Sequence, residues 1–203
     1  MKYQHRLTAA AQLTSLTLWP GCKSMDADHG HGGGESANAF AHVQSAICVL
    51  SATNGSADLP SVSGTITFTQ TDEGLRVQAQ VSGLKPNSKH GFHVHMFGDI
   101  SAANGTATGG HYNPREVAHG LPSAQGDHMH VGGHAGDLGN LEADANGHAS
   151  YDITYPELTL AGMNAVLGRA IIVHAGEDDG GQPTGNAGAR IAQGVIGIDR
   201  PGE

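Results

Sequence analysis

The chain has 203 residues, which fits one domain with a short appendage and excludes two large domains. Acidic residues outnumber basic ones by 19 to 10, and the resulting net charge of -9 argues against nucleic acid as a partner. The hydrophobic residues (38%) and 31 glycines indicate a globular protein, and the unusual count is 14 histidines, most of them between His90 and His174.

Residues 1–22 resemble a bacterial export signal. Lys2 and Arg6 precede an uncharged stretch over residues 7–19, and Cys22 follows a proline and a glycine. Three interpretations stay open: a lipoprotein-type leader with a lipid anchor at Cys22, a plain secretory peptide, and a frayed amphipathic terminus. The first two predict an exported protein, either periplasmic or attached to the bacterial cell envelope, and we expect export.

Residues 23–44 are rich in small residues and are expected to form a flexible tether. This segment contains His29 and His31, which could collect metal loosely or belong to a solvated linker. The tether therefore adds no defined site to the prediction.

From Ser45 onward, short apolar or alternating runs are separated by glycine, proline, asparagine and aspartate. This pattern predicts an all-β sandwich or barrel. Strands are expected over residues 47–50, 62–69, 75–81, 91–96, 148–154, 168–174 and 191–198. Residues 98–138 and 175–189 are poor in strand formers, and loops of such length in a compact domain usually carry the function.

Histidines in these segments have the spacing of metal ligands. His93 and His95 lie two residues apart on an expected strand, so both imidazoles project to one face. An exposed strand that binds no metal could carry the same pair, so the pair alone does not indicate a metal site. Further residues that can bind metal lie in the loops and at the end of a later strand: His111, His119, His134, Asp137 and His174. Six imidazoles and a carboxylate suit copper and zinc, and three histidines with an aspartate are typical of a closed zinc site.

Several segments, in this order, resemble the copper/zinc superoxide dismutases. They are GFHVH at 91–95, FGD at 97–99, GHYNP at 110–114, HAGDLGN at 134–140, IVH at 172–174, GNAGAR at 185–190 and GVIG at 194–197. The resemblance covers residues 45–199 and leaves 200–203 as a tail. It implies an eight-stranded Greek-key β-barrel that disproportionates superoxide to oxygen and hydrogen peroxide.

The resemblance also implies two metal sites that share one ligand. The implied copper ligands are His93, His95, His111 and His174, and the implied zinc ligands are His111, His119, His134 and Asp137. His111 would bridge the metals as an imidazolate and take up a proton for the peroxide. Copper would cycle between two oxidation states, while zinc would order its loop and tune the shared ligand.

Three further residues match family positions around the copper. Arg190 resembles the arginine that guides the anionic substrate, although an arginine that only ties down a loop fits as well. Thr184 matches the wall of the substrate channel. Asp178 matches an aspartate that links a copper ligand to a zinc ligand, and its neighbours Glu177 and Asp179 leave a shift by one residue open.

The chain departs from the family at a disulfide. Most relatives join the first long loop to the last strand, at positions that correspond here to Asn104 or Gly105 and to Gln193. The loss removes a cross-link typically worth about 2–4 kcal/mol. Cys48 is expected to face the barrel interior as a small apolar residue. Zinc is then expected to do more of the ordering of residues 98–138.

Each long loop also departs from those of relatives, one in length and the other in charge. The segment between His119 and His134 is longer than usual and contains His128 and His130, which are alternative zinc ligands. The HAGD sequence ending at Asp137 favours His134 over them. The loop over residues 175–189 has no lysine, so capture of superoxide is expected to be slower and less sensitive to salt than in relatives with lysines there.

Two rival functions stay open besides the enzyme. One is a copper/zinc-binding or metal-storage protein on the same barrel with little turnover. The other is a scaffold or adhesion module, which would leave the histidines unexplained. Segments around Cys48, 97–99, 167–168 and 195–198 resemble the interface of dimeric relatives and favour a homodimer.

Overall fold

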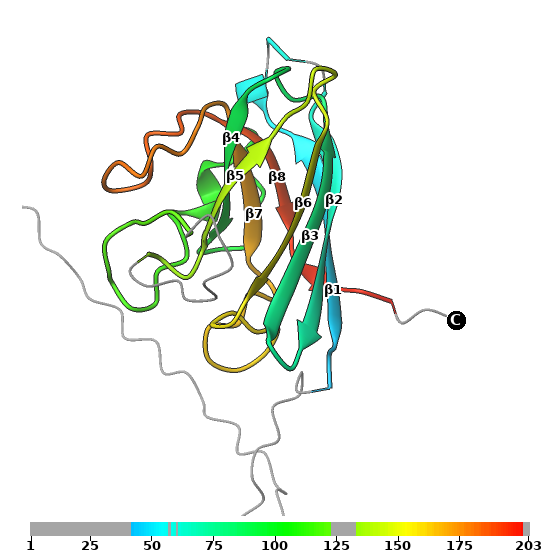
Figure 1. Ribbon diagram of the computed structural model, residues 1–203, viewed down its shortest axis with the longest axis vertical. Coiled ribbons are helices and arrows are strands. Elements are labelled where there is room, and N and C mark those ends of the chain that lie inside the picture. Colours follow the sequence, from blue (N-terminus) through cyan, green and yellow to red (C-terminus); the bar gives the residue numbers. More distant parts are fainter. Residues whose placement is uncertain (1–41, 57, 60, 123–132, 201–203) are drawn as a thin grey trace, which may run out of the picture. The chain divides into compact units, whose positions relative to one another are not determined.

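The computed structural model describes residues 42–56, 58, 59, 61–122 and 133–200 (Figure 1). The strands are β1 (Ser45–Ala52), β2 (Ser63–Thr71), β3 (Gly74–Ser82), β4 (Lys89–His95), β5 (Asp137–Glu142), β6 (Ala149–Tyr155), β7 (Ala170–His174), β8 (Arg190–Val195) and β9 (Gly197–Ile198). Two short 3-10 helices are η1 (Asn54–Ser56) and η2 (Thr106–Thr108). The predicted features at Cys22, His29, His31, His128 and His130 lie outside the described residues.

The strands form an antiparallel, nearly closed barrel with the order β5-β4-β7-β8-β1-β2-β3-β6 (Figure 1). Strand β1 joins the two halves because residues 45–50 pair with β2, whereas Ser51 and Ala52 pair with β8. This arrangement confirms the predicted all-β Greek-key barrel. Within the described residues, no helix is long and apolar enough to cross a membrane.

The hairpin of β2 and β3 shows why the alternating sequence forms strands. Ile66 and Phe68 on β2 and Leu75 and Val77 on β3 are buried, while the residues between them face outward or lie half-buried. Register pairs Thr71 with Gly74, which leaves a two-residue turn between the strands. One apolar face per strand thus supplies the barrel core.

Cys48 lies in that core, as the sequence predicts. Its side chain is fully buried, and burial raises the pKa of the thiol to about 12. Cys48 is a free cysteine, and no disulfide is present in the described part of the chain. Packing and hydrogen bonds of the backbone and side chains therefore hold the long loops to the barrel there.

Two tyrosines close the seam between the end strands of the sheet. The hydroxyls of Tyr151 and Tyr155 on β6 both contact the carbonyl oxygen of Leu138 on β5, at 2.6 and 3.0 Å. The ring of Tyr151 also packs edge-on against Phe92 of β4, with 5.2 Å between centroids. These contacts fix the start of β5, the strand that begins at Asp137.

Two elements differ from the sequence prediction. Strand β5 was not expected, because Asp137–Glu142 contains glycine and asparagine and lacks a clean alternation. The expected single run over residues 191–198 is divided: β8 pairs with β7 and with the end of β1, whereas β9 pairs with the start of β1. The break at Ile196, whose N–H bonds to the carbonyl of Arg169, lets the chain change partners.

Candidate metal centre

The ends of three strands bring the predicted ligands together. His93 and His95 lie on β4, His174 ends β7 and Asp137 begins β5. His111 forms an isolated antiparallel bridge with His95, which attaches the first loop to the end of β4. Strand ends therefore position most of the polar cluster, and its loop members are bonded back to the barrel.

The first group has the composition expected for copper. It consists of His93, His95, His111 and His174, and one ring nitrogen or ligand atom of each lies within 4.8 Å of the others. All four side chains are buried. Centroids of the His93 and His111 rings are 4.0 Å apart, and those of His93 and His174 are 5.0 Å apart. Residues that are 81 positions apart in the chain, such as His93 and His174, thus form one compact group.

Hydrogen bonds at the outer ring nitrogens set which nitrogen is free to bind a cation. His93 Nε2 donates to Asp178, His95 Nδ1 donates to the Gly109 carbonyl, and His174 Nδ1 donates to the Gly188 carbonyl. Each of these nitrogens carries the proton, so the other nitrogen of each ring carries a lone pair.

Those lone pairs lie in the cluster without partners. Among the described residues, His93 Nδ1, His95 Nε2 and His174 Nε2 are buried and have no hydrogen-bond partner. Burial lowers the pKa of His93 to about 4 and that of His174 to about 3, so both rings are neutral near pH 7. Buried acceptors without partners are costly, and a cation that prefers imidazole satisfies all three at once. The residues present fit copper.

The second group surrounds the carboxylate of Asp137. The Nδ1 atoms of His111, His119 and His134 lie 2.8, 2.8 and 3.1 Å from its oxygens. Burial would raise the pKa of Asp137, but contact with His111 and the Gly120 N–H hold it below the ordinary value. Three imidazoles and an ionised carboxylate fit the ligand set of a closed zinc site.

His111 belongs to both groups. Its Nδ1 lies beside Asp137 in the second group, so Nε2 is the nitrogen left for the first. One imidazole ring therefore connects the two candidate metal positions.

Asp178 forms a second connection between the groups. Its oxygens accept hydrogen bonds from His93 Nε2 at 2.8 Å and His119 Nε2 at 2.9 Å. Burial would raise its pKa, but these bonds hold the pKa well below its usual range. The structure brings Asp178 to this position and not its neighbours: Glu177 pairs with Lys89, and Asp179 accepts from Asn186.

The side chain of Asp178 packs so closely against position 185 that only glycine fits there. Gly185 has a φ of 78°, and a β-carbon on it would collide with Oδ1 of Asp178. The main chain of Asp178 is in turn bonded to the side chain of Asn140 on β5. Asp178 is thus fixed by both its side chain and its backbone.

His119 is also held by its main chain. The side chain of Gln182 accepts a hydrogen bond from the His119 N–H at 3.0 Å and donates one to the His119 carbonyl at 2.8 Å. Gln182 lies in the second long loop, as Asp178 does. Both the ring and the backbone of this zinc-group histidine are therefore oriented by the same loop.

Arg190 lies at the start of β8, opposite His174 in the register of β7 and β8. Its Nη1 donates to the Gly105 carbonyl at 2.6 Å and to Thr108 Oγ1 at 3.0 Å, and its Nη2 donates to the Gly109 carbonyl at 2.7 Å. Both predicted interpretations are therefore compatible: the guanidinium ties down the first loop, and it lies near enough to His95 and His174 to disfavour a positive charge on these two rings.

The remaining predicted residue, Thr184, lies in an exposed turn of the second loop.

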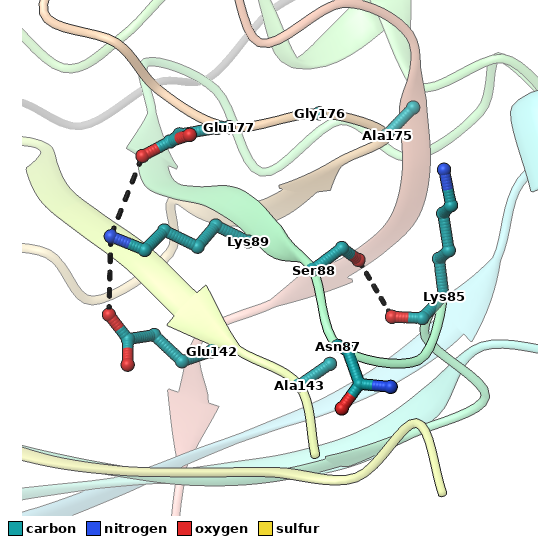
Figure 2. A pocket seen from close by; sticks show the side chains of 9 residues that line it. All are labelled: Lys85, Asn87, Ser88, Lys89, Glu142, Ala143, Ala175, Gly176 and Glu177. Carbon is teal, nitrogen blue, oxygen red and sulfur yellow. Dashed lines mark hydrogen bonds and ion pairs between the residues drawn. The ribbon is translucent and has the colours of Figure 1, made fainter. Parts of the chain in front are cut away.

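A pocket of about 500 Å³ lies near the other end of this loop, at the start of β4 (Figure 2). In this pocket, Nζ of Lys89 lies 3.4 Å from Oε1 of Glu142 and 3.5 Å from Oε1 of Glu177. Its charge is matched by two carboxylates, so Lys89 offers little attraction to an approaching anion.

Known proteins resemble this chain over the region that contains both ligand groups. The model of the copper/zinc superoxide dismutase family (SODC) matches residues 62–196, so the chain belongs to this family. The crystal structure of the clock protein EA4 is similar at 39% identity and a TM-score of 0.65, covering 77% of this chain and 95% of that one.

Three residues that hold the site have no signal in the sequence that indicates this role: Asn140, Gln182 and Thr108. Asn140 stands within a quoted motif, yet no spacing rule indicates that its amide bonds to a residue 38 positions later. Gln182 and Thr108 carry no motif signal, because their partners are brought near only by the fold.

Proposed function

We propose that the chain disproportionates superoxide, with one copper ion in the first group and one zinc ion in the second. Two superoxide anions and two protons give one oxygen and one hydrogen peroxide. The observation that carries this proposal is the shared ring of His111, flanked by three buried imidazoles whose free lone pairs face one another. A scaffold or adhesion module would have no use for such a cluster.

When bound, copper supplies the one-electron chemistry of the reaction and zinc a fixed positive charge. The protein's part begins with Arg190, a permanent cation that attracts and orients the anionic substrate at the first group. Its bonds to the first loop hold the guanidinium in one direction.

His111 supplies the proton. Its Nδ1 belongs to the zinc group, so Nε2 is the atom that can hold a proton for the peroxide product. Asp178 keeps His93 and His119 in fixed tautomers, which leaves the lone pair of His93 Nδ1 directed into the first group.

The test uses protein loaded with copper and zinc and follows the decay of superoxide. We expect catalytic decay in the wild type and its loss in His93→Ala and His111→Ala. His148→Ala is the matched control, because His148 bonds to Ser82 at the surface and touches neither group. A protein that binds both metals but leaves superoxide decay at the spontaneous rate would be a copper/zinc-binding or storage protein instead.

We further propose that the protein is exported to the periplasm or cell envelope. The charged start and uncharged stretch of residues 1–22 support this proposal. Mass spectrometry of the protein purified from a bacterial envelope fraction tests it. Cleavage near Cys22, with or without a lipid, is the expected result, and an intact amino terminus in the cytosol would contradict it.

A homodimer is proposed from the exposed apolar residues on β1, on β9 and just after β4. Val49 is 66% exposed, and Phe97 and Ile198 are each 54% exposed. Pairing of β9 with β1 brings Ile198 next to Ala46. Sedimentation of the wild type and of Phe97→Asp is expected to show a dimer and a monomer, and a monomeric wild type would refute the proposal.

A further inference from the structure

Thr108 is a buried polar residue of the first loop. It ends the short helix η2 and is 0% exposed. It lies three residues before the ligand His111 and 13 residues after the ligand His95. A hydroxyl at such a buried position needs hydrogen-bond partners.

The hydroxyl of Thr108 finds three partners. Its proton is donated to the Gly105 carbonyl at 2.9 Å. Its oxygen accepts from Arg190 Nη1 at 3.0 Å and lies 3.3 Å from His95 Nδ1, whose N–H bonds chiefly to the Gly109 carbonyl at 2.9 Å. A threonine hydroxyl has one proton and two lone pairs, so this set uses all of them.

These contacts give Thr108 a particular place in the site. The other acceptors of Arg190 in the first loop are the main-chain carbonyls of Gly105 and Gly109. Within the described residues, Thr108 is the side chain whose hydroxyl contacts both Arg190 and a copper-group histidine. Because two of its bonds are anchored on Gly105 and His95, its remaining lone pair has a fixed direction toward Nη1.

We propose that Thr108 is a positioning residue that directs the guanidinium of Arg190 toward the anion at the first group. The proposal rests on the proposed function, because it concerns how that site receives its substrate. Three bonds from two guanidinium nitrogens leave Nε–H and one Nη2–H of Arg190 for the anion. Loss of the Thr108 bond would let the guanidinium rotate about its remaining carbonyl contacts.

The experiment measures azide binding to the copper- and zinc-loaded protein by visible absorption. Azide is a small anion and stands in for superoxide without turnover. The variants are Thr108→Val, which removes the hydroxyl at similar volume, and Thr108→Ser, which keeps it. Thr106→Val is the matched control, because Thr106 lies in the same helix, is exposed, and its hydroxyl bonds to Asn104 and not to Arg190 or His95.

We expect Thr108→Val to raise the dissociation constant of azide about tenfold, as for loss of one hydrogen bond to a charged group. Thr108→Ser and Thr106→Val are expected to stay near the wild type. In an Arg190→Ala background, Thr108→Val is expected to have no further effect, because the residue acts through the arginine. An equal loss in both backgrounds would show a general structural role and overturn the proposal.

Two outcomes separate this inference from the proposed function. A wild type that retains copper and zinc and binds azide, with Thr108→Val unchanged, overturns the inference alone. A wild type that retains no copper overturns both. Should Thr108→Val not fold, Thr108→Ala serves as the variant without the hydroxyl, with thermal unfolding of the metal-free proteins as the check on folding.

Discussion

The side-chain amide of Asn140 makes two hydrogen bonds to the main chain of Asp178. Oδ1 accepts from the Asp178 N–H at 2.8 Å, and Nδ2 donates to its carbonyl at 2.9 Å. Asn140 lies on β5, three residues after the zinc-group carboxylate of Asp137. The strand that supplies one ligand thus also holds the aspartate that orients His93 and His119, so both groups depend on one rigid element.

Replacing Asp178 by asparagine is expected to weaken zinc binding by about 10–100-fold. The amide has one acceptor oxygen, so one of the two histidine N–H groups loses its partner. Asn140→Ala is expected to cause a smaller loss in the same direction. Zinc dissociation constants measured by competition with a chelator check both, and unchanged affinity in Asp178→Asn would contradict the assigned link.

Gln182→Met is expected to raise the zinc dissociation constant about tenfold, at the lower end for residues that orient a ligand. Methionine has a similar length but cannot bond to the N–H and carbonyl of His119. Gln80→Met is the control, because Gln80 is an exposed residue of β3 that bonds to Ser150. Equal affinities in the two variants would show that Gln182 does not orient His119.

Removal of zinc is expected to loosen the first loop and to weaken copper retention. No disulfide joins this loop to the barrel in the described residues. Hydrogen bonds hold it instead: Gln193 donates to the carbonyls of Ile100 and Ala102 at 3.3 Å, and Arg190 donates to the carbonyls of Gly105 and Gly109. Amide hydrogen exchange over residues 98–122 is expected to accelerate in zinc-free protein. A loop that remains equally protected would refute this expectation.

Capture of superoxide is expected to depend only weakly on ionic strength. Lys89 is paired with two glutamates, and the net charge is -9, so attraction comes from Arg190 and the bound metals within a Debye length of about 8–10 Å. Rates of superoxide decay from low to high salt test this prediction. A steep fall with added salt would mean that more distant charges steer the substrate.

The Cys48 thiol is expected to be unreactive in the folded protein. Burial raises its pKa to about 12, so the thiolate fraction is negligible at pH 8, and the side chain is inaccessible. Mass spectrometry of the Cys48 peptide after treatment with iodoacetamide should show alkylation only when denaturant is present. Rapid alkylation without denaturant would place the thiol at the surface.

Much of the barrel could be predicted because buried strands leave a period of two in the sequence. The β2–β3 hairpin is the clearest example, with Phe68 and Val77 facing the core. Strand β5 was missed because Asp137–Glu142 lacks the alternating pattern: Gly139 has a positive φ of 84°, and Asn140 bonds to Asp178. Its neighbours and the tyrosine contacts at Leu138 stabilise it, and these are tertiary features.

The ligand groups could be predicted from residue type, spacing and family resemblance, but their supports could not. Strand geometry alone places His93 and His95 on one face. The sequence could not tell which of three adjacent acidic residues links the two groups, and only the folded structure identifies Asp178. Gln182 and Thr108 act through backbone groups and an arginine far away in sequence. Such contacts have no local signature, because they arise only when two loops pack together.

The most direct test of the paired metal site is one measurement of superoxide decay by protein with known metal content. Copper and zinc are determined per chain, and the decay rate is measured on the same sample. We expect one copper and one zinc per chain, with a decay rate that rises in proportion to bound copper. Full occupancy of both metals without acceleration of superoxide decay would contradict it.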